Sequence, residues 1–133
     1  MVTIQIYFGY QWDIYSSKTN KSRNNTSLAV FKKIETYILK IKKESSDNIR
    51  FGKLRASAWG LLYDVIIKRI SESDILIFDI FQNNNNVWIE VGMALSARYL
   101  AGNPSKIFLL TESTTKELEF ELPSDLQGYF LSH

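Results

Sequence analysis

Apolar residues fall into short continuous runs at three places along the chain, and each run is typical of a buried strand. The first, at residues 2–8, alternates with polar residues at its start, then becomes continuously apolar and ends at Gly9. Two shorter runs, at residues 75–78 and 107–110, are wholly apolar between polar neighbours, as strands buried on both faces are. A weaker apolar stretch at residues 49–51 predicts a further short strand.

Between the first two strands the apolar residues recur at intervals of three and four, which is the spacing of one helix face. The predicted helix is capped by Thr26 or Ser27 and runs to about Lys43. Its apolar stripe consists of Leu28, Phe31, Ile34, Ile38 and Ile41. The preceding residues 10–26 are mostly polar and predict a long loop, of the kind that is often functional.

Two further helices follow from the same spacing. Ser57 is expected to cap a helix that runs to about Ile70, and a third helix is expected from Val87 to about Leu100, before a Gly-Asn-Pro stop. A short helix is expected to start at Pro123.

The order of these elements indicates one α/β domain over residues 1–133. Right-handed crossovers place helices on both faces of such a sheet. We therefore expect a small three-layer sandwich with a largely parallel, flavodoxin-like sheet of about four to five strands. Ligands of these sheets bind outside the carboxyl ends of the strands, so the loops after Phe8, Phe78 and Leu110 are the candidate sites.

Composition removes several classes of chemistry. The chain has no cysteine, which excludes disulfides, thiolate nucleophiles and cysteine-type zinc sites. Its one histidine, His133, is the last residue, which argues against histidine metal clusters and a Ser-His-Asp triad. Catalysis must then rest on carboxylates, hydroxyls, amides or phenols, and we expect no metal and no resident cofactor. Since no apolar run approaches the roughly 18 residues that span a bilayer and no signal-peptide pattern opens the chain, we expect a cytoplasmic protein without a membrane partner.

Charge is unevenly distributed along the sequence. Residues 18–55 contain eleven Lys and Arg against three acidic residues, whereas residues 56–133 contain ten acidic residues against five basic ones. A basic segment can bind phosphate or nucleic acid. The interpretation we favour is a solvated helix face, because most of the lysines fall on the polar side of the first predicted helix, and we do not expect a nucleic-acid partner.

Glu90 is the strongest candidate for chemistry because of its neighbours on the third predicted helix. With Asn86 as the N-cap, Glu90 lies past the third helical position, so it is not the reciprocal partner of a capping box. Its same-face neighbours, Met93, Ala94 and Ala97, are all apolar. A surface glutamate is the ordinary alternative. We favour a carboxylate that is partly buried, or placed at the rim of a cleft, beside a strand's carboxyl end.

The sequence around this helix resembles the core of the nucleoside 2-deoxyribosyltransferase-like group and of the related TIR-like nucleotide-binding proteins. In both, a strand ends in an aspartate, a short Asn-containing loop follows, and a helix opens with an aromatic residue, a glutamate and usually a glycine. Here those features fall within residues 73–79 and 85–95. Residues 122–129 also resemble the closing segment of many TIR-like proteins.

The resemblance implies roles for the matching residues. The family's helix glutamate cleaves or transfers an N-glycosidic bond, a role that falls on Glu90, and its strand-end aspartate, which orients the sugar or assists the base, falls on Asp79. The family's base-contacting first loop corresponds to Gly9, Tyr10, Gln11, Trp12 and Asp13. We add four candidate substrate-binding residues, Phe8, Asn86, Trp88 and Gly92.

The residue types fit this chemistry on their own. Breaking a ribosyl C–N bond passes through an oxocarbenium-like state, whose positive charge needs a fixed carboxylate beside the anomeric carbon. A second acid, Asp79 or Asp13, can hold a ribose hydroxyl or move a proton. Aromatic side chains can stack on the base, the candidates being Tyr10, Trp12 and Trp88.

We therefore expect an enzyme, an N-glycosidase or N-glycosyltransferase that acts on a nucleoside, a nucleotide or an NAD-type dinucleotide. NAD would be a substrate and not a cofactor, and we expect the chain to form a homo-oligomer. The alternative is a non-catalytic nucleotide-sensing or self-assembling TIR-like module of the same fold. The absence of a glycine-rich phosphate loop argues against simple NTPase and Rossmann dehydrogenase functions.

Overall fold

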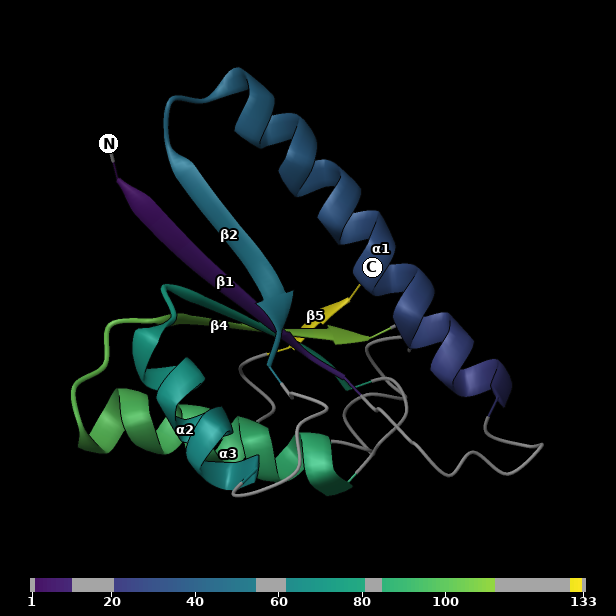
Figure 1. Ribbon diagram of the computed structural model, residues 1–133. Coiled ribbons are helices and arrows are strands. Elements are labelled where there is room, and N and C mark those ends of the chain that lie inside the picture. Colours follow the sequence, from purple (N-terminus) through teal and green to yellow (C-terminus); the bar gives the residue numbers. More distant parts are fainter. Residues whose placement is uncertain (1, 11–20, 55–61, 81–84, 112–129, 133) are drawn as a thin grey trace.

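The computed structural model describes residues 2–10, 21–54, 62–80, 85–111 and 130–132. Its centre is one sheet, with helix α1 (Lys21–Glu44) on one face and helices α2 (Leu62–Glu72) and α3 (Asn85–Leu100) on the other (Figure 1). The expected three-layer α/β sandwich is therefore confirmed.

The sheet has five strands in the order β2-β1-β3-β4-β5, and every neighbouring pair is parallel. This is the flavodoxin-like order that the alternation of strands and helices predicts. The bounds of the strands are β1 Thr3–Gly9, β2 Asn48–Lys53, β3 Ile75–Asp79, β4 Lys106–Thr111 and β5 Phe130–Ser132. The weak strand at residues 49–51 is confirmed as edge strand β2, while the sequence analysis did not predict β5.

The helices differ from the predicted ones mainly at their starts. Helix α1 begins at Lys21, so the last part of the predicted loop at residues 10–26 is helical, and Thr26 and Ser27 lie inside α1 instead of capping it. Helix α3 begins at Asn85, which places Asn86 within the helix and not at its N-cap. The predicted cap at Ser57 and the short helix at Pro123 lie outside the described residues.

The face under α1 is held by aromatic rings. Phe8 and Phe51, from β1 and β2, meet Phe31 of α1, and the rings of Phe31 and Phe51 stack with centroids 4.8 Å apart. Tyr10, just beyond β1, joins this cluster with its centroid 5.6 Å from that of Phe8. These rings supply the apolar contact between α1 and strands β1 and β2.

The face under α2 and α3 is packed mainly by aliphatic side chains. Its fully buried members include Ile66 from α2, Val91 from α3 and Leu76 and Leu109 from the central strands. Alternation along the strands explains the division, because Ile6 and Phe8 of β1 point toward α1 whereas Tyr7 points to the other face.

Within the described residues, none of the three helices combines the length and the apolar composition that crossing a bilayer requires.

Candidate functional site

The strand order contains one place where the direction of the connections reverses. The chain leaves β1 through α1 toward β2 on one side, and leaves β3 through α3 toward β4 on the other, while β1 and β3 pair directly. In flavodoxin-like sheets the crevice at this switch point, outside the carboxyl ends of the strands, is where ligands bind. The residues at these two ends are Gly9 and Tyr10 after β1, and Asp79 and Ile80 after β3.

Glu90 reaches the switch point from α3. It is the sixth residue of that helix and is 1% exposed, so its side chain lies inside the protein and not on the surface. A Cβ built on Gly9 would lie 3.2 Å from Glu90 Oε2. The carboxyl group therefore lies against the end of β1, although Glu90 is 81 positions further along the chain.

Gly9 makes this approach possible. A side chain on Gly9 would point to the face of α3, as Tyr7 does, and its Cβ would come within 2.6 Å of Phe78 Cδ1 and 2.8 Å of Phe78 Cε1. Distances this short are not tolerated by a carbon atom. Glycine at this position thus leaves the space into which the Phe78 ring and the Glu90 carboxyl fit.

The second predicted carboxylate lies at the same edge of the sheet. Asp79 is the last residue of β3 and is 4% exposed. Alternation after Ile77, which packs under α1, assigns Asp79 to the α1 face, whereas Glu90 comes from the α3 face. The two carboxyls therefore approach the carboxyl edge from opposite faces of the sheet.

Burying two carboxyls near one sheet edge needs a physical reason. A charged group removed from water costs several kcal/mol unless partners compensate it, and apolar residues would fill the same space at no such cost. Within the described residues, the other buried polar side chains are the small hydroxyls of Ser73 and Ser105. Asp79 and Glu90 are thus the acids that the described part of the chain buries.

The other candidate residues take different positions. Phe8 is fully buried in the aromatic cluster under α1, and Tyr10 is 6% exposed in the same cluster. Trp88 is half-buried against the aliphatic cluster, while Asn86 and Gly92 are exposed on α3. Their substrate contacts remain predictions, and Gln11, Trp12 and Asp13 lie outside the described residues.

Two residues near this edge were not among the predicted site residues. Phe78 was interpreted only as strand core, because its contact with Gly9 depends on the register between β1 and β3. Lys53, at the carboxyl end of β2, is exposed, and its Nζ lies 5.9 Å from the centroid of the Tyr10 ring. The signal for Lys53 was present in the sequence, since a cation that ends a parallel strand lies at the ligand-binding edge.

Comparison with known proteins adds no family to this description. No protein-family model, no curated protein and no solved structure matches the chain. The site is therefore interpreted from its own geometry. Among the described residues, no group of three or more His, Asp and Glu side chains is arranged to hold a metal ion.

Proposed function

We propose that the protein is an N-glycosidase or N-glycosyltransferase that acts on a nucleoside, a nucleotide or an NAD-type dinucleotide. The observation that carries this proposal is the position of Glu90, a buried carboxyl held against Gly9 at the switch point of the sheet. A ligand bound at the carboxyl ends of β1 and β3 would lie on the side of the sheet edge to which this group belongs.

The proposed reaction needs what this edge of the sheet supplies. As the bond between the sugar and the base breaks, positive charge develops on the ring oxygen and the anomeric carbon. Glu90 stabilises that charge or attacks the anomeric carbon, and water or an acceptor base then completes hydrolysis or transfer. In this proposal Asp79 holds a sugar hydroxyl from the opposite face of the sheet.

The resemblance to the 2-deoxyribosyltransferase-like and TIR-like groups supports the same assignment. The residues that carry it, Asp79 and Glu90, are the two buried acids of the described structure. The resemblance and the burial are independent observations, because the sequence pattern alone does not determine which carboxylates are enclosed.

Product analysis tests the proposal directly. The protein is incubated separately with NAD, with deoxynucleosides and with nucleotides, and the products are separated by chromatography. We expect release or exchange of the base with at least one substrate. Ligand-induced thermal stabilisation with no product from any of them would instead identify a nucleotide-sensing module.

Substitution of Glu90 tests the catalytic assignment. We expect Glu90→Gln to lower turnover by about 100-fold or more, since it keeps the shape and removes the charge that stabilises the transition state. Glu72→Gln is the matched control, because Glu72 is also a helical glutamate but is exposed at the end of α2. Full activity of Glu90→Gln would falsify the assignment.

A further inference from the structure

A second feature lies far from Glu90, between α1 and the edge strand β2. A groove of about 380 Å³ separates the two elements there, and it is lined by Glu35, Ile38, Leu39, Lys42, Ile49, Arg50 and Phe51. Ile49 and Phe51 pair in register with Ile4 and Ile6 of β1, whereas the switch point is at Gly9. Ile6, the partner of Phe51, precedes Gly9 by three residues, so this end of the groove lies about 10 Å along β1 from the switch point, at 3.3 Å per residue.

The edge of β2 in this groove offers backbone hydrogen-bonding groups. The amides of Asn48 and Leu54 donate to the carbonyls of Val2 and Phe8 at 2.9 Å, so the even-numbered residues of β2 face β1. In a parallel strand the intervening residues then direct their N–H and C=O groups away from β1. Ile49 and Phe51 therefore present these groups on the side of β2 where no other described strand lies. An edge of this kind is a template for a further strand.

The groove combines apolar surface with positive charge. Leu39 is 54% exposed although it is apolar, and it lies beside buried Ile38 and half-buried Phe51. Two cations, Lys42 and Arg50, line the groove against one acid.

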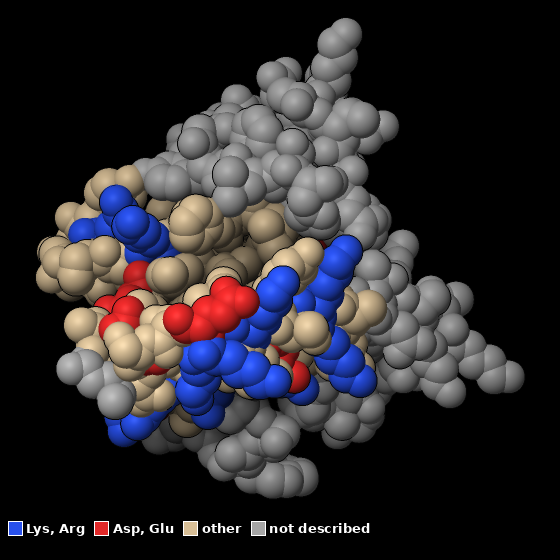
Figure 2. Space-filling view, turned by 90° about the horizontal axis from the view of Figure 1, so that it is seen from above, with Lys and Arg blue, Asp and Glu red and all other residues tan. Residues whose placement is uncertain are grey.

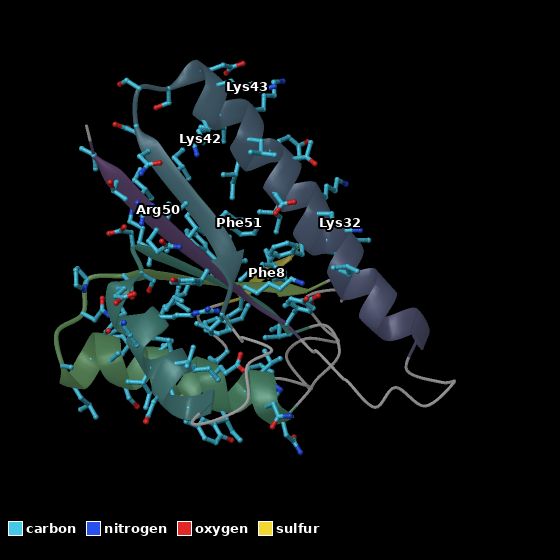
Figure 3. All side chains as sticks on the ribbon, in the orientation of Figure 1. Phe8, Lys32, Lys42, Lys43, Arg50 and Phe51 are labelled. Atoms are coloured by element: carbon cyan, nitrogen blue, oxygen red, sulfur yellow. The ribbon has the colours of Figure 1, made fainter. Side chains whose placement is uncertain are left out.

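More basic side chains surround the groove. Lys43 follows in the last turn of α1, and Figure 3 shows Lys42, Lys43 and Arg50 on the two elements that form it. On the face shown in Figure 2, Lys and Arg make up most of the charged surface of the described residues. The ion pair found among the described residues joins Lys68 to Glu72 on α2 and leaves these cations to solvent. The chemistry of the groove therefore favours an acidic, partly apolar chain segment.

We propose that this groove binds a second copy of the same chain through residues 117–122, which add to β2 as an extended strand. Their sequence is Glu-Leu-Glu-Phe-Glu-Leu, in which acidic and apolar residues alternate. Because neighbours along a strand point to opposite faces, one face of this segment is wholly apolar and the other wholly acidic. No other six-residue stretch of the chain has this alternation.

The two faces of the segment match the two faces of β2. Ile49 and Phe51 share the α1 face of the sheet, so the apolar face of the added strand covers them together with Leu39. Arg50 alternates to the opposite face, so it is the cation that lies beside the glutamates of the added strand, while Lys42 and Lys43 on α1 contribute their positive field at longer range. Arg50 would also repel the Arg50 of a second β2 strand. Pairing of β2 with the acidic segment is therefore favoured over pairing of β2 with β2.

Peptide binding is the first test, and it does not depend on the activity of Glu90. The synthetic peptide Glu-Leu-Glu-Phe-Glu-Leu is titrated into the full chain and followed by calorimetry. Arg50→Glu is expected to weaken its affinity at least tenfold. Lys33→Glu is the matched control, since it makes the same charge change on an exposed residue of α1 that does not line the groove. Equal affinity of both variants, or equal binding of the peptide Lys-Leu-Lys-Phe-Lys-Leu, overturns the proposal.

Sedimentation of the full chain tests the second copy as the occupant. The chain is expected to associate as its concentration rises, and either Arg50→Glu or the pair Glu119→Lys and Glu121→Lys is expected to reduce the association constant at least tenfold. Mixing these two charge-reversed chains restores association, because each then carries the charge that the other requires. A chain that binds the peptide but stays monomeric, or charge-reversed chains that do not recover on mixing, rules out the second copy.

Discussion

The two faces of the sheet are packed by different chemistry. Under α1, four aromatic side chains, Phe8, Tyr10, Phe31 and Phe51, form one cluster, and the buried acid of that face, Asp79, lies at the end of β3. Under α2 and α3 the buried side chains are mainly aliphatic, and Glu90 is enclosed beside Val87, Val91 and Ala94 on the same helix.

This difference separates packing from chemistry. The aromatic cluster gains stability from every ring that it buries, whereas Glu90 brings a carboxyl, with its desolvation cost, in among the aliphatic side chains. Strained or costly groups of this kind concentrate at functional sites. Substitutions on the α1 face are thus expected to change stability above all, and substitutions around Gly9 and Glu90 are expected to change activity as well.

The largest effect is expected from Phe31→Ala. Phe31 is 7% exposed and contacts the rings of Phe8, Tyr10 and Phe51, so its removal opens a cavity at the centre of the aromatic cluster. We expect the free energy of unfolding to fall by about 3–5 kcal/mol, measured by urea denaturation. Tyr37→Ala on the same helix is the control, since Tyr37 is 61% exposed and should change stability by less than about 0.5 kcal/mol. Similar losses for the two variants would mean that α1 is not held by this cluster.

The next effect concerns the junction where the two faces meet. Gly9→Ala places a methyl group 2.6 Å from the Phe78 ring and 3.2 Å from Glu90, so the ring and the carboxyl must move. We expect a loss of about 1–3 kcal/mol in the free energy of unfolding and a fall in turnover beyond what the unfolded fraction explains. Gly92→Ala is the matched stability control, because nothing lies within 4 Å of its Cβ position and alanine favours a helix by about 0.5–1 kcal/mol. Normal turnover in Gly9→Ala would separate Glu90 from the reaction.

The sequence was sufficient for the architecture because its apolar runs and its three-and-four spacing are local signals. Residues 75–78 and 107–110 are typical of central strands, and both lie in strands whose ends are within one residue of the predicted ones. The start of α1 escaped prediction because residues 21–27 carry no apolar stripe. Strand β5 escaped it because three residues, Phe130–Ser132, are too few to show a period.

The candidate site could be predicted only in part. Local neighbours in the sequence indicated that Glu90 is unusual, and it is indeed buried. Its contact with Gly9 could not be derived, because that contact depends on how far α3 is set along the sheet and on the register of β1 with β3. The same dependence on register concealed the role of Phe78, which faces Gly9 across the two strands.

A smaller effect is expected where α2 is tied to the sheet. Arg69 Nη1 donates to the carbonyl oxygens of Lys53 at 2.6 Å and Leu54 at 3.3 Å, and its guanidinium lies 5.5 Å from the centroid of the Tyr7 ring. We expect Arg69→Ala to lower the free energy of unfolding by about 1.5 kcal/mol, the contribution of a hydrogen bond from a charged group. Arg69→Lys should recover less than half of this loss in the same denaturation experiment, since an ammonium cannot reproduce the planar donor pair. Full recovery of the free energy of unfolding in Arg69→Lys would show that the positive charge, and not the guanidinium geometry, ties α2 to the end of β2.

The smallest effect on stability is expected at Lys53, where the aromatic face reaches the ligand-binding edge. Its Nζ lies 5.4 Å from the centroid of the Phe31 ring and 5.9 Å from that of Tyr10, so Lys53→Met should cost only about 0.5 kcal/mol in the free energy of unfolding. If the proposed function holds, the same substitution should weaken binding of a phosphorylated substrate and leave that of the matching nucleoside unchanged, because an exposed ammonium at the carboxyl edge can pair with a phosphate. Thermal shift assays with a nucleoside and its monophosphate measure both. An equal loss for the two ligands would place Lys53 with the packing of the α1 face and not with the substrate.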